Sequence, residues 1–227
     1  MKKAMKFAAV CCGLSFAGQA HAAPILDQLN NPPINVVFQA RDIDYWGQSF
    51  TVGMAGQLSS ILVDVGTLNV PPVIVNFYLA PIINGVALFS QSTQLDILSS
   101  DIVGKGINKG PVFADWLNLD FSPFDIRVDV GDQFALIFHS PITFAEMGGP
   151  EYKQINWYGG VPGGYLGGTP IQVSTLADRT ILVRNDFDAA FATFVTPLPE
   201  PVSISIMAVG LAGVVVARRR RKNSEPA

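Results

Sequence analysis

Hydrophobic and polar residues alternate with a period of two through most of the chain between residues 48 and 195, most clearly in Val73–Ala80. This is the repeat of a β-strand with one buried face. Gly, Pro, Asn and Asp interrupt the alternation at short intervals, as turns do. Strands are therefore predicted at Gln48–Gly53, Leu58–Val65, Val73–Ala80, Trp116–Phe121, Phe124–Val128, Gln133–His139 and Ala190–Val195. No helical stripe interrupts this series, and the sequence predicts an all-β antiparallel sandwich.

Two details of the strand pattern make specific predictions. Leu58–Val65 is expected to be a single strand, because Ile61, Val63 and Val65 share one face. Phe124–Val128 and Gln133–His139 are expected to form a hairpin, because the turn-forming run Asp129–Asp132 separates them.

The start of the chain has the three parts of a secretory signal peptide. Met1–Lys6 is basic, Phe7–Gly18 is apolar, and Ala20 and Ala22 supply small residues for a cut after Ala22. The apolar run is about twelve residues, well below the roughly twenty that span a bilayer. Residues 1–22 are therefore predicted to be removed, leaving an extracytoplasmic body at residues 23–196.

The end of the chain, residues 197–222, also has three parts in a fixed order: Pro199, Glu200 and Pro201, then the apolar run Val202–Ala217, and then the cluster Arg218, Arg219, Arg220, Arg221 and Lys222. The apolar run predicts a transmembrane helix, and the arginines predict that its far end stays in the cytoplasm.

This tail resembles the PEP-CTERM sorting signal of Gram-negative bacteria. The resemblance implies an exported protein that is first anchored in the inner membrane, with its body outside the cytoplasm. It also implies an exosortase-type protease that processes the tail near the motif. The processed body then reaches the cell surface or the extracellular medium.

The body resembles the jelly-roll-like sandwiches of exported bacterial proteins with varied anchors, the choice-of-anchor type. The segments that carry this resemblance are Gln48–Gly53, Leu58–Ile61, Trp116–Phe121, Gly131–Leu136, Trp157–Gly160 and Asp188–Thr193. Such sandwiches are similar in shape to carbohydrate-binding domains, although a fold alone does not define a ligand.

Charge and cysteine content exclude several classes of function. Between Ala23 and Pro199 the chain has sixteen acidic and seven basic residues, so its body repels phosphate backbones and nucleic-acid binding is not expected. Cys11 and Cys12 lie in the predicted signal peptide. The mature body is thus expected to have no disulfide, cysteine–zinc site or thiol nucleophile.

Few residues suggest catalysis. His139 is the one histidine left after signal removal, and a structural role at the end of its apolar strand is favoured. Two aspartate trios offer oxygen ligands for calcium: Asp125, Asp129 and Asp132, and Asp178, Asp186 and Asp188. Neither trio has EF-hand spacing, so solvated turn residues are the favoured interpretation and no cofactor is expected.

Six glycines in Gly159–Gly168 are typical of a mobile surface loop. Trp157, Tyr158 and Tyr165 border this loop, and exposed rings there are candidates for stacking on sugars. The expected function is a non-enzymatic surface or matrix protein that binds or structures exopolysaccharide. The alternatives are a secreted glycan-active hydrolase, which needs a pair of carboxylates, and a surface protein without a ligand.

Overall fold

The structure is a computed structural model that describes residues 22–33, 36–39, 42, 44–102, 116–149, 153–161, 164–173, 179–180 and 187–198. All the elements below belong to one compact unit, Pro24–Pro197. A second unit comprises Met1–Ala23 and Leu198–Ala227. Ala20, the Pro-Glu-Pro motif, the predicted transmembrane helix and the arginine cluster lie outside the described residues.

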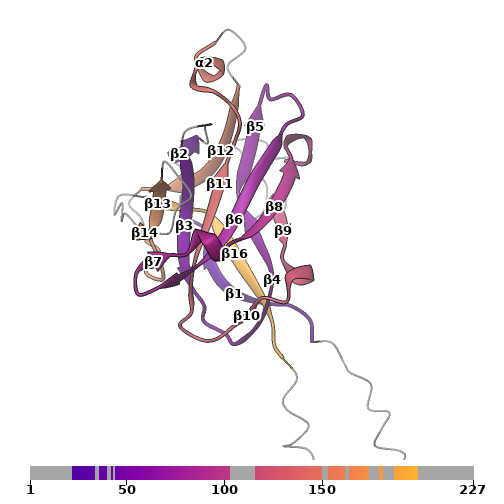
Figure 1. The fold of residues 1–227 in the computed structure, drawn as a ribbon, viewed down its shortest axis with the longest axis vertical. Helices are drawn as coiled ribbons and strands as arrows, with labels where there is room; N and C mark the ends of the chain where they lie inside the picture. The colour runs from indigo at the N-terminus through magenta and orange to yellow at the C-terminus, as the bar shows by residue number, and fades with distance from the viewer. Residues whose placement is uncertain are drawn as a thin grey trace, which may run out of the picture. The chain divides into compact units, whose positions relative to one another are not determined.

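The first layer of the body is an antiparallel sheet in the order β1-β16-β4-β10, with β9 also paired to β4 (Figure 1). Its strands are β1 (Ile25–Asn30), β16 (Phe191–Thr196), β4 (Gly56–Val63), β10 (Arg127–Val128) and β9 (Leu117–Asp120). The pairing of β1 with β16 ties the first described strand to the last one.

This layer continues into a smaller sheet, in which β12 (Gln154–Gly160) pairs with β15 (Asp188–Ala189), β2 (Val36–Gln39) and β5 (Val65–Leu68). Backbone hydrogen bonds link the two sheets where β4 passes into β5 and β15 passes into β16. The N–H of Tyr158 donates to the carbonyl of Asp64 over 2.8 Å, and the N–H of Ala190 donates to the carbonyl of Tyr158 over 2.8 Å. At this junction β12 pairs with both β5 and β15. These are the continuations of β4 and β16, which pair directly with each other further along.

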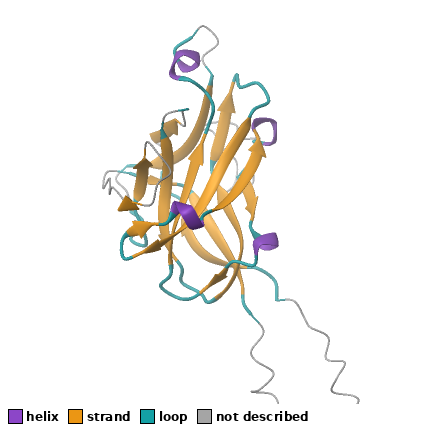
Figure 2. Ribbon diagram, in the orientation of Figure 1, coloured by secondary structure: helices purple, strands orange, loops and turns teal. Residues whose placement is uncertain are grey.

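The second layer is an antiparallel sheet in the order β13-β3-β11-β6-β7-β14, with β8 also paired to β6. Its strands are β13 (Pro170–Val173), β3 (Tyr45–Thr51), β11 (Gln133–His139), β6 (Ile74–Ile83), β7 (Val86–Ala87), β14 (Arg179–Thr180) and β8 (Thr93–Leu98). Short helices lie between strands: η2 (Phe89–Gln91), η3 (Ser99–Asp101), η4 (Ser122–Phe124) and α2 (Phe144–Met147) (Figure 2).

Aromatic rings pack the two layers together. Phe50 of the second layer lies 5.9 Å from Phe191 of the first, measured between ring centroids. Phe138 meets Trp157 edge-on at 5.6 Å. All four side chains are at most 1% exposed, so these contacts form the centre of the core. The prediction of an all-β antiparallel sandwich is confirmed.

The predicted single strand at 58–65 is wrong. The chain leaves β4 at Val63 and enters β5 at Val65, and the two strands belong to different sheets. The break falls at Asp64, which is fully buried. Ile61, Val63 and Val65 are also fully buried. The alternation of apolar residues therefore continues across the break, and the sequence does not reveal that one strand ends and another begins there.

The predicted hairpin around residues 129–132 is also wrong. β10 pairs with β4 in the first layer, whereas β11 pairs with β3 and β6 in the second. The turn therefore carries the chain from one layer to the other. Its backbone still has the expected turn chemistry, because Gly131 has a φ of +95°.

The glycine-rich segment is packed at both described ends. A Cβ on Gly159 would collide with the carbonyl oxygen of Asp188, and one on Gly168 would collide with that of Ser49. Gly159 lies in β12, and the segment Gly164–Thr169 contacts β3. The interpretation as a mobile surface loop is therefore corrected at these positions, where glycine permits close approach of two backbones.

Candidate functional site

The structure buries two of the three aromatic residues predicted to contact sugars. Trp157 is 0% exposed, and its indole N–H donates to the carbonyl of Ala190 over 2.8 Å. Tyr158 is buried beside it in β12. Neither ring face is open to a ligand, so their assignment as glycan-binding residues is corrected: they belong to the core.

Tyr165 is half-buried and held by several contacts. Its ring lies edge-on to Phe191 at 5.1 Å, and its hydroxyl donates to Oε1 of Gln28 over 3.3 Å. Its backbone N–H donates to the buried carboxylate of Asp188 over 2.9 Å. Burial raises the pKa of the Tyr165 hydroxyl to about 12. Tyr165 thus fixes the glycine-rich segment against β1 and β15.

The described aspartates of the two trios have structural contacts. The carboxylate of Asp132 accepts the backbone N–H of Asp129 over 2.8 Å, which closes the turn between the layers. Asp125 has a left-handed backbone with a φ of 48°, just after η4. Asp188 accepts Nε2 of Gln48 over 3.2 Å. Asp178 and Asp186 lie outside the described residues, and within those residues no three metal-ligating side chains converge.

His139 lies at the end of β11, on the outer face of the second layer. Its ring stacks on Tyr45 with the centroids 4.5 Å apart, and its Nε2 lies 3.3 Å from the carbonyl oxygen of Asp42. These contacts place His139 in a packed aromatic pair.

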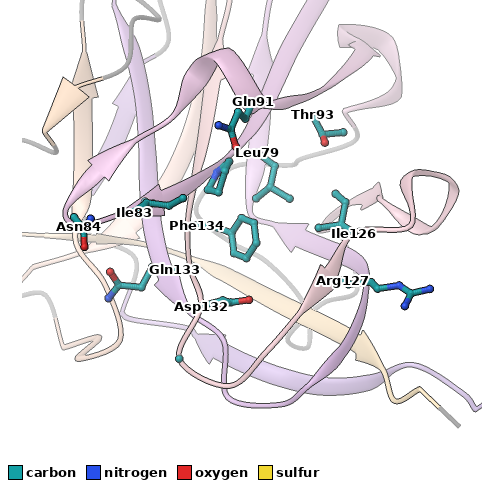
Figure 3. Close-up of a pocket in the computed structure, with 13 residues that line it drawn as sticks. Leu79, Ile83, Asn84, Gln91, Thr93, Ile126, Arg127, Asp132, Gln133 and Phe134 are labelled. Atoms are coloured by element: carbon teal, nitrogen blue, oxygen red, sulfur yellow. The ribbon is translucent and has the colours of Figure 1, made fainter. Parts of the chain in front are cut away.

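A cavity of about 640 Å³ opens between the layers where β10 faces the beginning of β11 (Figure 3). Its walls come from β6 and the turn after it, from η2 and β8, from β10, and from the turn before β11. The volume is in the range typical of small-ligand pockets.

The cavity has an apolar floor and a polar rim. Phe134 and Leu79 lie at the bottom and are buried, with Phe134 stacked on Phe50 at 5.8 Å. The more open apolar surface comes from Ile83, which is 51% exposed, and from the half-buried Ile82 and Ile126. The rim carries amide, hydroxyl and charged groups from Asn84, Gln91, Thr93, Arg127, Asp132 and Gln133. An apolar floor with hydrogen-bonding groups on its rim suits a ligand that has both apolar faces and hydroxyl groups.

The geometry of the rim follows from local sequence. Asn84 and Gly85 have positive φ values of 52° and 75°, which close the two-residue hairpin between β6 and β7. This turn brings Asn84 to the mouth of the cavity. Gln133 is oriented by Thr51, whose Oγ1 accepts Nε2 of Gln133 over 3.3 Å.

The two charged rim residues have limited scope for catalysis. Among the described residues that line the cavity, Asp132 is the only carboxylate, and it is engaged by the turn. Arg127 lies 3.9 Å from Asp125, and both side chains are largely exposed. In Figure 3 the Arg127 guanidinium points away from Phe134.

Comparison with known proteins gives distant structural likenesses. The chain matches no protein-family model, and no curated protein matches it. A clostridial cysteine protease, Cwp84, after propeptide cleavage is similar with a TM-score of 0.49 and 10% identity, over 77% of this chain and 40% of that one. The cysteine protease and lectin-like domains of Cwp84, a surface layer associated protein of Clostridium difficile, give 0.47 and 10%, over 77% and 36%.

This chain therefore spans less than half the length of those structures, and neither likeness carries an inference about function. Among the residues that the structure describes, no helix is long and apolar enough to cross a membrane. Fold and cavity together define an all-β sandwich with a mixed apolar and polar pocket at one opening between its layers.

Proposed function

We propose that this chain is an exported, non-enzymatic protein that binds glycan chains at the cell surface or in an extracellular polysaccharide matrix. The cavity around Phe134 carries this proposal. A sugar ring has an apolar face that suits the isoleucine side chains of the cavity wall, Ile82, Ile83 and Ile126. Its hydroxyl groups suit the amides of Asn84, Gln91 and Gln133. The acidic body favours neutral or cationic polymers over acidic ones.

A secreted hydrolase remains the second candidate, because sandwiches with acidic residues can host paired carboxylates. The lining of this cavity favours binding instead, since the described residues there place no second carboxylate beside Asp132. A turnover assay on any glycan that binds separates the two candidates: release of reducing ends would favour the hydrolase.

Binding is tested by a glycan array with the full chain in detergent micelles, followed by titration with the best ligand. Replacing Asn84 or Gln91 with Ala removes one neutral hydrogen-bonding group, so each variant is expected to bind about 3- to 10-fold more weakly. Asn118→Ala is the matched control, because Asn118 is an exposed amide on β9 and does not line the cavity. Equal affinity in all variants would overturn the cavity as the binding site.

Export and sorting are tested separately from binding. The first residue of the exported protein is expected to be Ala23. Glu200→Ala leaves the apolar run intact, so unprocessed protein should accumulate in the membrane of a host that has the sorting protease. Neutral replacement of Arg218–Arg221 removes the orientation signal and should give misoriented or fully exported protein. If both variants fractionate like the wild type, the tail is not a sorting signal.

A further inference from the structure

The outer face of the second layer carries a group of polar and aromatic side chains away from the cavity. On β6, Val75, Phe77 and Leu79 point into the core, so Asn76 and Tyr78 point outward. The same alternation directs residues of β8, β11 and β3 to this face. We call the group Gln94, Asp96, Asn76, Tyr78, His139 and Tyr45 the outer-face platform.

Strand pairing makes the platform continuous across four strands. Asn76 lies opposite Asp96 in the pairing of β6 with β8, and Tyr78 lies opposite Gln94. On the other side of β6, Asn76 lies opposite His139 of β11. Cross-strand partners on one face are close enough for their side chains to act together.

Hydrogen bonds fix the carboxylate of the platform. Oδ1 of Asp96 accepts Nε2 of Gln94 over 2.6 Å and Nδ2 of Asn76 over 2.8 Å. These bonds, the one from Gln94 first, hold the pKa of Asp96 below its usual value. Both donors are neutral amides, so they orient the carboxylate without cancelling its charge.

Ring contacts fix the aromatic part. His139 stacks on Tyr45, and Tyr45 meets Tyr78 edge-on with the ring centroids 6.4 Å apart. The two tyrosines border a buried apolar cluster on the same face, which includes Ile137 and Ile171. They are half-buried, whereas Gln94 and Asp96 are exposed. The rings are thus supported from one side and partly open on the other.

We propose that the outer-face platform is a second binding site, and that it takes the protonated amino-sugar units of a glycan chain. A tyrosine ring edge or face suits the apolar side of a sugar, and an oriented carboxylate beside it suits an ammonium group. The excess of acidic residues in the body disfavours uronic acids at the same surface. The class of ligand, a glycan, rests on the proposed function. The site lies on a different surface from the cavity.

The test uses three oligosaccharides of equal length, built from glucosamine, N-acetylglucosamine or galacturonate, titrated into the full chain in detergent micelles. The pH is one at which the glucosamine amines are protonated. The wild type is expected to bind the glucosamine oligomer most tightly, with a preference that falls as salt rises. Asp96→Asn keeps the size and polarity of the side chain and removes its charge. It should weaken glucosamine binding about 2- to 5-fold, the range for a solvent-exposed ion pair.

Asp120→Asn is the matched control. Asp120 is likewise an exposed carboxylate on a strand, it accepts hydrogen bonds from Ser122, and hydrogen bonding lowers its pKa too. It belongs to the other layer, so this variant should bind as the wild type does. Tyr78→Ala should weaken both the glucosamine and N-acetylglucosamine oligomers, with the melting temperature measured to verify folding.

The outcomes separate the platform from the cavity. Equal binding of the glucosamine and N-acetylglucosamine oligomers, or equal losses in Asp96→Asn and Asp120→Asn, overturns the platform. If glycan binding still depends on Asn84 and Gln91, the proposed function survives that result. Conversely, the glucosamine preference could be lost in Asp96→Asn and unchanged in the Asn84 and Gln91 variants. That result supports the platform and overturns the cavity as the binding site.

Discussion

Trp157 and Tyr78 are both aromatic residues within strands, and they lie in opposite environments. In β12 all seven positions are buried, so Trp157 and its polar neighbour Asn156 are both inside the protein. In β6 buried and half-buried positions alternate from Val75 to Leu79, and Tyr78 lies on the outer face near Asp96. Polar neighbours in the sequence therefore do not show that an aromatic residue is open to a ligand. That depends on which face of the sheet the residue occupies.

Among the substitutions that test this comparison, Trp157→Ala should have the largest effect on stability. The indole fills the space against Phe138 and satisfies the carbonyl of Ala190, so its removal leaves a cavity and loses a hydrogen bond. We expect the free energy of unfolding to fall by about 3–5 kcal/mol. Tyr78→Ala should cost less than about 2 kcal/mol, because that ring is half-exposed already. Denaturant titration of both variants measures the difference, and equal costs would contradict the assignment of the two faces.

The same contrast explains how much of the fold could be predicted. β11 was predicted to the residue, and β6 was predicted from one residue early to three residues short of its end. Period two marks β6, whereas β11 is apolar from Phe134 to Phe138 and is delimited by the polar residues at its two ends. In β12, polar and apolar residues alternate only from Gln154 to Trp157, and the polar residues there do not mark a solvent-facing side, because all seven positions of the strand are buried. The alternation of Thr93–Leu98 and the Asn84–Gly85 pair are further sequence signals, the first for β8 and the second for the hairpin between β6 and β7.

Pairing partners and sites were harder to predict than strands. The turn at residues 129–132 looks like a hairpin turn whether its strands pair or join different layers, since local chemistry is the same in both cases. The described lining of the cavity comes from four separate parts of the chain, none of which contains a motif. The outer-face platform depends on the register of β6 against β8 and β11, which no single strand encodes.

Two glycines of the glycine-rich segment allow a second comparison of a packed position with an open one, with a smaller expected effect on stability. Gly168→Ala should destabilise the protein by about 1–3 kcal/mol, because the new methyl group meets the backbone of Ser49, which cannot move aside easily. Gly164→Ala is the control, since a Cβ there has no neighbour within 4 Å. That variant should be neutral or slightly stabilising. Similar melting temperatures for both variants would restore the interpretation of a loose loop.

Two glutamines extend the comparison to polar side chains. Gln48 is 1% exposed; it donates to Asp188, and its Oε1 accepts the N–H of Ala189 over 3.1 Å. Gln48→Ala should cost about 1–3 kcal/mol, because it leaves a buried N–H without that acceptor. Gln94→Ala, on the exposed face, should stay within about 0.5 kcal/mol of the wild type. Thermal melts monitored by circular dichroism give both values, and a cost for Gln94→Ala as large as for Gln48→Ala would count against the buried network.

The smallest expected effect concerns two aspartates whose pKa values move in opposite directions. Asp27 of β1 accepts the N–H of Gly53 over 3.0 Å and the hydroxyl of Thr193 over 3.3 Å, yet burial outweighs these bonds and raises its pKa. Asp96 is exposed and hydrogen-bonded, and its pKa is lowered. The two carboxylates should therefore respond oppositely to pH.

For Asp27, the folded protein holds its proton to a higher pH than the unfolded chain, whose pKa is near 3.8. Its contribution to stability is thus present below that value and is lost as pH rises through the folded pKa. For Asp96 the folded pKa lies below 3.8, so its contribution is present above 3.8 and is lost as pH falls. Asp27→Asn should accordingly gain stability relative to the wild type as pH rises from about 3 to 7, and Asp96→Asn should lose it. Both effects should be below about 1 kcal/mol because solvent screens both groups. Unfolding free energies across that range measure the two slopes; slopes of the same sign would mean that burial does not govern Asp27.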